Sequence, residues 1–306
     1  MGTNETLRLN PIQRRLLIRQ LHAMLEEDLG FGDITTQALI APTQWAQARF
    51  VSRQSGVVAG TEIVAEFLGS LGFELVRYLS DGTPIDENST ILEVPGPAPS
   101  LLALERPLLN LLMRMSGIAT LTAAMVTAAR KANPNVRVAA TRKTAPLLRV
   151  FDKLAVIAGG GDPHRWRLDD AVLIKDNHLA VTDNITQTIK TVRQKVSFTK
   201  LIEIEVHTPK DAVTAARAGA DAILLDNMTP TLVSKAVTAI KKLKLTKPPT
   251  LEASGNITLD NVAKYAATGV DVISAGALTH SVKALDLSVD LIPFTSFPGK
   301  GGFPSE

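Results

Sequence analysis

The sequence predicts an α/β protein in two parts: a small N-terminal α+β region, followed by a barrel of parallel strands and helices. Residues 46–94 hold short β-leaning runs divided by Gly, Asp and Asn. From residue 136 onward, apolar strand-like runs alternate with helical stretches. Such alternation forces parallel strands, because every connection is then a crossover. At least six units of this kind fit a closed or nearly closed barrel, with a doubly wound open sheet as the competing topology.

The N-terminal part begins with an amphipathic helix at residues 11–27, where apolar side chains follow a helical period after a proline. A polar stretch with two glycines, residues 26–36, is expected to form a loop. A helical piece at residues 62–71 then lies among four β-leaning runs: 48–52, 56–59, 73–78 and 90–94.

The middle of the chain is expected to be helical. Residues 95–99 read Pro-Gly-Pro-Ala-Pro and predict a rigid connector. A helix follows from Leu101 to Lys131, which Ser116-Gly117 is expected to interrupt. Arg106 and Arg114 are the conspicuous charges in this apolar stretch. For either arginine alone, the simplest interpretation is a head group that reaches solvent along the helix surface.

The C-terminal part has strands separated by helices with recognisable caps. Thr208-Pro209 begins one such helix and Gly219 ends it, as expected from the preferences for Thr at the N-cap, Pro at the first position and Gly after the last turn. Strands are predicted at residues 136–140, 171–174, 201–206, 222–225, 250–253 and 270–273.

Composition excludes several classes of function. The chain is 45% hydrophobic and has a net charge of +3, so it can build a core but has no dedicated nucleic-acid surface. It has no cysteine, which removes disulfides and thiolate chemistry. No apolar stretch is expected to span a membrane, and residues 1–10 lack the features of a secretory signal. We therefore expect a soluble cytoplasmic protein with no membrane partner.

Polar residues follow the predicted strands at the ends that face the active site in parallel β/α folds. One such residue would usually be a helix cap or a surface charge, but strands that end this way six times in succession make that interpretation improbable. In chain order, the strand ends carry Arg142-Lys143, Lys175, Glu205, Asp226, Ser254-Gly255-Asn256 and Ser274-Ala275-Gly276.

These residue types indicate binding of phosphate and of a second anion. The two turns of small residues precede helices, whose N-terminal N–H groups hold phosphate. Arg142, Lys143, His164, Arg165 and Lys175 supply more positive charge than one monoanion needs. A dicarboxylate together with a polyphosphate would account for them, because Arg forks pair with carboxylates. A His beside an Arg is more often a neutral hydrogen bonder than a switch.

Glu205 and Asp226 end adjacent predicted strands. Paired carboxylates beside phosphates hold Mg²⁺ or the hydroxyls of a ribose. The alternative is a structural ion network with Lys175 and Lys143. Glu203 shares a face with Glu205 in a regular strand, but the position at the strand end favours Glu205.

Several of these segments resemble the quinolinate phosphoribosyltransferases, also called nicotinate-nucleotide pyrophosphorylases, of the type II phosphoribosyltransferase family. The resemblance runs in order along nearly the whole chain. It includes Glu105-Arg106, Thr141-Arg142-Lys143-Thr144, Gly159-Gly160-Gly161 with His164-Arg165, Lys175-Asp176-Asn177-His178, Glu203-Ile204-Glu205-Val206, Glu252-Ala253-Ser254-Gly255-Asn256 and Ser274-Ala275-Gly276.

This resemblance implies an N-terminal α/β sandwich, residues 1–115 joined by 286–306, and an incomplete α/β barrel, residues 116–285. It also implies a reaction that joins quinolinate to phosphoribosyl pyrophosphate with Mg²⁺, giving nicotinate mononucleotide, CO₂ and pyrophosphate in NAD biosynthesis. The partners are then these two substrates and further copies of the chain, at least as a dimer.

By the same resemblance, Arg142, His164, Arg165 and Lys175 surround the quinolinate carboxylates, and Arg106 reaches in from a neighbouring subunit. Lys143 contacts the pyrophosphate, while Glu205 and Asp226 contact the ribose hydroxyls and the metal. The expected catalytic residues are Lys143, Lys175, Glu205 and Asp226. The remaining expected substrate-binding residues are Thr141, Ser254, Gly255, Asn256, Ser274, Ala275, Gly276 and His280.

The departures from the family pattern are modest. Thr144-Ala145-Pro146-Leu147 stands where the family usually has a second Thr and a Gly after the Pro, which puts the loop conformation after Lys143 in question. Two other functions compete: a molybdenum-transport-associated homologue with another substrate, and a phosphate-binding barrel without catalysis. A phosphate-binding barrel without catalysis does not need Arg142, Arg165 and Lys175 together. The molybdenum-transport-associated homologue has a different sequence at the strand end that carries Lys175.

Overall fold

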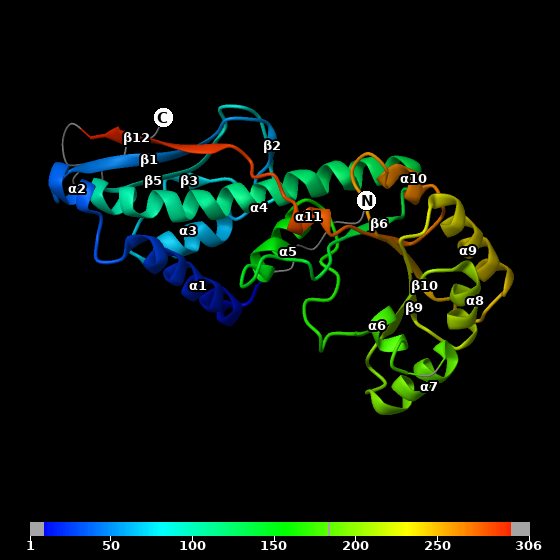
Figure 1. Cartoon of the computed structure of the whole chain (residues 1–306). Helices are drawn as coiled ribbons and strands as arrows, with labels where there is room; N and C mark the ends of the chain where they lie inside the picture. The colour runs from blue at the N-terminus through cyan, green and yellow to red at the C-terminus, as the bar shows by residue number, and fades with distance from the viewer. Residues whose placement is uncertain (1–8, 183, 295–306) are drawn as a thin grey trace. The chain divides into compact units, whose positions relative to one another are not determined.

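The computed structural model describes residues 9–182 and 184–294 (Figure 1). They form two compact units. One unit combines the described chain up to Thr120 with the described chain from Lys283 onward, and Leu121–Val282 forms the other. The first contains an antiparallel sheet and the second a parallel sheet. The predicted α/β class is therefore confirmed.

The first unit is built on a four-stranded sheet in the order β12-β1-β5-β3. Strand β12 from the far end of the chain pairs with β1 along its length, from Ala46↔Pro293 to Ser52↔Leu287. Helices α1 and α3 lie on the same side of this sheet (Figure 1). The elements of the unit are α1 Pro11–Leu29, α2 Ile34–Leu39, β1 Trp45–Ser52, β2 Gly56–Val57, α3 Thr61–Ser70, β3 Arg77–Tyr78, β4 Pro84–Ile85, β5 Thr90–Pro97 and β12 Leu287–Pro293.

Three of these elements, α2, β4 and β12, were not predicted. The expected loop at residues 26–36 ends inside α2, because Asp33 caps this short helix by accepting the Thr35 and Thr36 N–H groups at 3.1 and 3.0 Å. Strand β4 has only two residues, too few to show a period.

The expected connector at residues 95–99 is instead the end of β5 and the start of the next helix. The Glu93 carbonyl accepts the Val76 N–H on the β3 side of β5. Pro95 and Pro97 face the same side, because the pairing direction alternates along a strand. Strand β3 does not extend that far, so no neighbouring strand needs the N–H that each proline lacks.

Helix α4 spans Ala98–Ala132 without a break, so the expected interruption at Ser116-Gly117 is wrong. Ser116 Oγ accepts the Ala59 N–H at 3.1 Å. A Cβ atom on Gly117 would come within 2.3 Å of the Lys283 carbonyl oxygen. The two small residues thus allow other backbone segments to approach the helix closely.

The expectation that no apolar stretch reaches membrane-spanning length also needs correction. By length and composition alone, α4 could cross a membrane, since its most apolar 18 residues have a mean hydropathy of 1.4. In the structure, 56% of that window is buried within the protein. Leu112 and Met115 are fully covered. Its packing is that of a core helix.

The second unit contains the six-stranded parallel sheet, and each of its strands lies where the sequence predicts one. The strands are β6 Arg137–Ala139, β7 Val172–Ile174, β8 Ile202–Val206, β9 Ala222–Asp226, β10 Thr250–Ser254 and β11 Val272–Ser274. The helices are α5 Arg149–Ala158, α6 Asp176–Leu179, α7 Ile185–Lys195, α8 Pro209–Arg217, α9 Pro230–Lys242, α10 Val262–Ala266 and α11 Ala277–His280.

The strand order is β6-β11-β10-β9-β8-β7. It follows the chain from β7 to β11 and then meets β6, as in a barrel, whereas a doubly wound sheet reverses direction at a switch point. Within the described residues, no ladder joins β6 to β7. The outer edge of β6 instead bonds to Asp162, whose carbonyl accepts the Ala140 N–H at 2.9 Å and whose N–H donates to Val138 at 2.8 Å. The barrel is thus incomplete.

Candidate active site

The polar residues that follow the parallel strands gather at one edge of the sheet. Asp226, at the end of β9, is in register with Ser254 at the end of β10. Ser274, at the end of β11, is in register with Ala139 of β6, and the Ala275 N–H donates to the Ala139 carbonyl at 3.0 Å. The turns after β10 and β11 therefore lie next to the segment that follows β6.

Two arginines of the predicted anion site lie close to one another. Burial and the nearby Arg142 guanidinium lower the pKa of Arg165. Arg142 Nε is buried and has no hydrogen-bond partner within the described part of the chain, whereas Arg165 Nη1 donates to the Ala171 carbonyl at 3.1 Å. Paired guanidinium groups with an unused buried donor fit an anion supplied from outside.

The His164 ring is held by protein groups on both of its nitrogens. Nδ1 accepts the Arg165 N–H at 2.7 Å, so the proton belongs on Nε2, which lies 3.2 Å from Glu252 Oε2. Burial lowers the pKa of His164, but the Glu252 hydrogen bond and the charges of Glu252 and Glu203 outweigh it and raise the pKa above 6.5. The Arg165 N–H opposes this rise, because Nδ1 cannot accept it once protonated. We favour the neutral ring.

Glu203 and Glu252 form a buried pair of carboxyl groups beneath His164, which lies 3.8 and 3.2 Å from them. Burial and the Glu252 charge raise the pKa of Glu203 to about 8. Oε1 of each glutamate is buried without a hydrogen-bond partner within the described residues. Sequence reasoning set Glu203 aside in favour of Glu205 and gave Glu252 no role, although each is a charge inside an apolar strand.

Lys175 and Glu205 form a direct ion pair, with 2.5 Å between Nζ and Oε2. Glu205 is buried and Lys175 is partly exposed. The structural ion network that competed with a ligand role for Glu205 therefore exists at Lys175. The carboxylate of Asp176 and a ring nitrogen of His207 lie within 4.8 Å of a Glu205 oxygen, and sequence reasoning missed both as neighbours of this site.

Asp226 lies next to this ion pair on the neighbouring strand. Its Oδ2 accepts the Asn227 Nδ2–H at 2.6 Å and is 3.8 Å from His207 Nδ1. Carboxylate oxygens suit Mg²⁺, which usually keeps waters and binds through few protein ligands. Because Lys175 already occupies one oxygen of Glu205, these residues fit an ion that is held largely through substrate and water.

The turn after β10 requires its glycine. Gly255 has φ 97°, and a Cβ atom there would lie 2.2 Å from Asn227 Oδ1. Asn256 Nδ2 donates to the same oxygen at 3.1 Å. Ser274 Oγ donates to Ser254 Oγ at 3.0 Å. The two predicted phosphate turns are therefore joined through their serines.

Lys143 lies against the turn after β11. A Cβ atom on Gly276 would come within 3.0 Å of Lys143 Cδ and 2.8 Å of His280 Cδ2. The Thr279 hydroxyl donates to the Lys143 carbonyl at 2.8 Å. The Lys143 N–H donates to Thr141 Oγ1 at 3.0 Å. Of the predicted site, the structure thus groups Thr141, Lys143, Gly276 and His280.

The departure from the family pattern at residues 144–147 has a structural consequence. Leu147 adopts φ 63° at the position where the resemblance expects glycine. The loop thus takes a left-handed backbone, which glycine adopts without strain and leucine does not.

Arg106 belongs to the first unit. Its guanidinium lies 3.8 Å from the Glu105 carboxylate, and its side chain is 58% exposed. In this chain it reaches solvent, in agreement with the simplest interpretation of the sequence.

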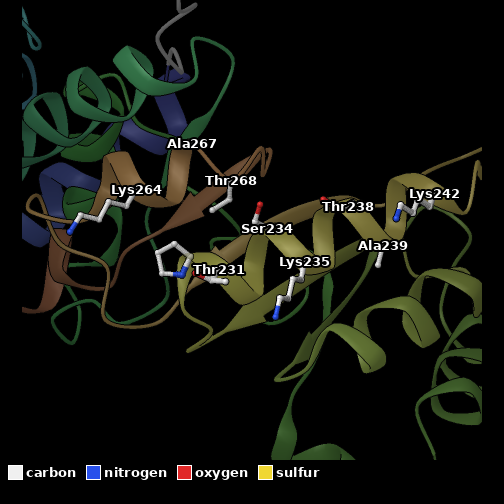
Figure 2. Close-up of a pocket in the computed structure, with 10 residues that line it drawn as sticks. Thr231, Ser234, Lys235, Thr238, Ala239, Lys242, Lys264, Ala267 and Thr268 are labelled. Carbon is white, nitrogen blue, oxygen red and sulfur yellow. The ribbon is translucent and has the colours of Figure 1, made fainter.

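A groove of about 700 Å³ lies elsewhere in the second unit, between α9 and α10. Figure 2 shows Ser234, Lys235, Thr238 and Lys264 among the side chains that line it. None of the predicted site residues lines this groove. It is therefore not the anion site that is predicted at the strand ends.

Comparison with known proteins decides the family. Residues 33–116 match the N-terminal domain of quinolinate phosphoribosyl transferase and residues 118–290 match its C-terminal domain. The chain belongs to the quinolinate phosphoribosyltransferase family. In this family, a probable nicotinate-nucleotide pyrophosphorylase (carboxylating) of Methanothermobacter thermautotrophicus is 46% identical over 271 residues, which are 89% of this chain and 97% of that protein.

Other relatives agree with this assignment. The human nicotinate-nucleotide pyrophosphorylase (carboxylating) is 38% identical, over 83% of this chain and 85% of its own. The crystal structure of the nicotinate-nucleotide pyrophosphorylase from Ehrlichia chaffeensis is similar with a TM-score of 0.83 and 35% identity, over 89% of this chain and 97% of that chain. The quinolinate phosphoribosyltransferase fold is thus shared along nearly the whole length.

Proposed function

We propose that this protein transfers the phosphoribosyl group of phosphoribosyl pyrophosphate to quinolinate with loss of CO₂, giving nicotinate mononucleotide and pyrophosphate for NAD biosynthesis. Membership of the quinolinate phosphoribosyltransferase family supports the reaction. The observation that carries it at the site is the pair Arg142 and Arg165, with the buried, unpaired Nε of Arg142. Paired arginines are suited to a dicarboxylate.

The reaction divides into two balanced steps. The quinolinate nitrogen forms a bond to the anomeric carbon of the ribose while the bond from that carbon to pyrophosphate breaks. Positive charge develops on the ribose, and Glu205 and Asp226 are placed to stabilise it, with Lys143 beside the leaving group. The alkylated ring nitrogen, now cationic, accepts the electron pair of the carbon–carboxylate bond as CO₂ leaves, and the ring carbon takes up a proton.

The chain's own part is mainly positioning and charge placement. Arg142, Arg165 and Lys175 would bind the quinolinate carboxylates, and the serine-linked turns 254–256 and 274–276 would bind the 5′-phosphate through backbone N–H groups. His164 holds the backbone of Arg165 in place and does not bind substrate itself, because its ring nitrogens already contact Glu252 and the Arg165 N–H. Mg²⁺, when bound near Glu205 and Asp226, would supply charge neutralisation for the pyrophosphate.

We further propose a cytoplasmic homodimer with shared active sites. The resemblance brings Arg106 to the quinolinate of a neighbouring subunit, and its exposed position in this chain leaves it available for that role.

The deciding experiment mixes the purified protein with quinolinate, phosphoribosyl pyrophosphate and Mg²⁺. We expect nicotinate mononucleotide and CO₂ in equal amounts. Chromatography measures the nicotinate mononucleotide, and release of label from the carboxylate of quinolinate measures the CO₂. Absence of both products would refute the enzymatic proposal and favour a phosphate-binding barrel. Turnover of another pyridine or acid in place of quinolinate would favour the molybdenum-transport-associated homologue.

A further inference from the structure

Helix α5 carries a lysine that is wholly buried beside the candidate site. Lys153 has no exposed surface, and its helix neighbours Phe151, Ala155 and Val156 are equally covered. A buried ammonium group is costly unless hydrogen bonds and charges compensate for the lost water. Sequence reasoning gave this residue no role.

The Lys153 ammonium bonds to the backbone of the segment that carries His164 and Arg165. Its Nζ donates to the Pro163 carbonyl and to the Arg165 carbonyl, the latter at 2.8 Å. The Trp166 ring lies over the same nitrogen, 5.7 Å from its centroid. Both hydrogen-bond acceptors are carbonyls, so the bonds fix a backbone path.

The opposite side of this segment is also held. The His164 N–H donates to Asp162 Oδ1 at 2.7 Å, and the His164 ring joins the Arg165 N–H to Glu252. His164 itself has φ 53°, a left-handed conformation that a residue with a Cβ keeps only when its surroundings impose it. Lys153 supplies that restraint from the helix side.

The charges that face Lys153 come from several elements. Burial and the Arg149 guanidinium lower the pKa of Lys153 to about 8, and Arg142 acts in the same direction. Two carboxylates, Asp162 and Asp170, act in the opposite direction. His164 also faces the ammonium. The Lys153 ammonium therefore loses its proton at a pH at which an exposed lysine keeps it.

We propose that Lys153 is a positioning residue for the dicarboxylate substrate: it fixes the Pro163–Arg165 backbone and thereby the direction in which the Arg165 guanidinium reaches quinolinate. This inference rests on the proposed function, since it assumes that Arg165 binds quinolinate. Within the described residues, the hydrogen bonds of Lys153 run to Pro163 and Arg165 and not to the phosphate turns. Its loss should therefore affect one substrate and spare the other.

The test compares Lys153→Met, which keeps the length of the side chain and removes the donor, with the wild-type protein. Calorimetry of quinolinate binding at pH 7 should show affinity about tenfold weaker or worse, as loss of charge-assisted hydrogen bonds implies. KM for phosphoribosyl pyrophosphate should stay within about twofold, since its turns make no bond to Lys153. Lys190→Met, at an exposed position of α7, is the matched control and should leave both values unchanged.

A pH series separates positioning from a general packing role. Between pH 7 and pH 9, wild-type affinity for quinolinate should weaken about three- to tenfold, because a neutral amine donates weaker hydrogen bonds than an ammonium group. Lys153→Met should show no such change. Equal effects on both substrates, no effect on quinolinate, or an unchanged pH dependence in Lys153→Met would each overturn the inference.

If Lys153→Met does not fold, the variant Glu203→Gln tests whether Lys153 or Glu203 causes the pH dependence of quinolinate binding, because Glu203 also has a pKa of about 8. The wild-type weakening above pH 8 should persist in Glu203→Gln, and its disappearance would assign the effect to Glu203 and overturn the inference. Failure of the proposed function looks different. Quinolinate would then bind with the expected Lys153 dependence, yet no nicotinate mononucleotide would form.

Discussion

At the residue scale, the candidate site is defined by buried polar atoms that lack partners within the described part of the chain. Arg142 Nε, Glu203 Oε1 and Glu252 Oε1 are such atoms. A buried polar atom without a hydrogen bond costs stability, so each indicates something that the free chain does not supply. For Arg142 we propose an anion, and for the two glutamates we propose a proton that they share, in agreement with the raised pKa of Glu203.

Arg142→Ala should weaken quinolinate binding about 10- to 100-fold, because it removes a charge-assisted pair to a carboxylate. KM for phosphoribosyl pyrophosphate should change little. Steady-state kinetics with each substrate varied in turn measures both values. Arg167→Ala, at an exposed arginine, is the control. A larger effect on phosphoribosyl pyrophosphate would show that the assignment of the two anions is reversed.

Glu203 links pH to stability. Its pKa is about 8 in the folded protein, against an ordinary value of 4.5. Between these values the unfolded chain has lost the proton and the folded chain keeps it, so stability falls as pH rises through this window. Below about pH 4.5 both states are protonated and the contribution is complete.

Glu203→Gln should therefore become more stable relative to the wild type as pH increases from 5 to 8.5, because glutamine has no proton to lose. Thermal unfolding at both pH values gives the difference in Tm. The exposed Glu74→Gln serves for comparison and should show no such trend. A constant difference between Glu203→Gln and the wild type would contradict the shared-proton interpretation.

At the scale of elements, the two glycines inside helices α3 and α4 differ in how closely other atoms pack against them. Gly117 lies in the middle of α4, where the Lys283 carbonyl would be 2.3 Å from an added Cβ. Gly69 lies in α3, and nothing is within 4 Å of a Cβ there. The local sequence makes both look like weak points of a helix. Only the neighbouring backbone distinguishes them.

Gly69→Ala should stabilise the protein by about 0.5–1 kcal/mol, the usual gain in a helix. Gly117→Ala should destabilise it by about 1–3 kcal/mol, because the backbone at Lys283 must move. Chemical denaturation of both variants measures the two free energies of unfolding. Stabilisation by both substitutions would show that the close approach at Gly117 is not restrictive.

At the scale of the whole molecule, the residues proposed for the active site are divided between the units. Arg106 belongs to the first unit, and Lys175, Glu205 and Asp226 belong to the second. The proposed homodimer would complete each site with an arginine from the other copy. In a symmetric dimer this arrangement occurs twice.

Arg106→Ala and Lys175→Ala should each be nearly inactive alone, yet a mixture that has exchanged subunits should recover about a quarter of the wild-type activity. Random pairing makes half of the dimers mixed, and each mixed dimer has one intact site of two. Activity after co-refolding measures the recovery. If the mixture stays inactive while each variant is folded and dimeric, Arg106 does not act across subunits.

The sequence by itself determined the α/β class, the six parallel strands and the polar residues that end them. These features are local, because residues that are close in the sequence determine apolar runs, helix caps and strand ends. Arg142, Lys175, Glu205 and Asp226 could be selected because parallel strands end at one edge. The continuity of α4 could not be predicted, since Gly117 is required by the close approach of the Lys283 backbone, which is distant in the sequence.

Only the tertiary structure decided how those residues are held. His164 looked like a substrate ligand, yet its ring is engaged by Glu252 and the Arg165 N–H. Lys153 carried no local signal, and its role arises from carbonyls on another segment. Hydrogen-bond partners and burial depend on residues distant in the chain. Sequence patterns therefore show which groups reach the site, whereas packing determines which of them remain free to bind.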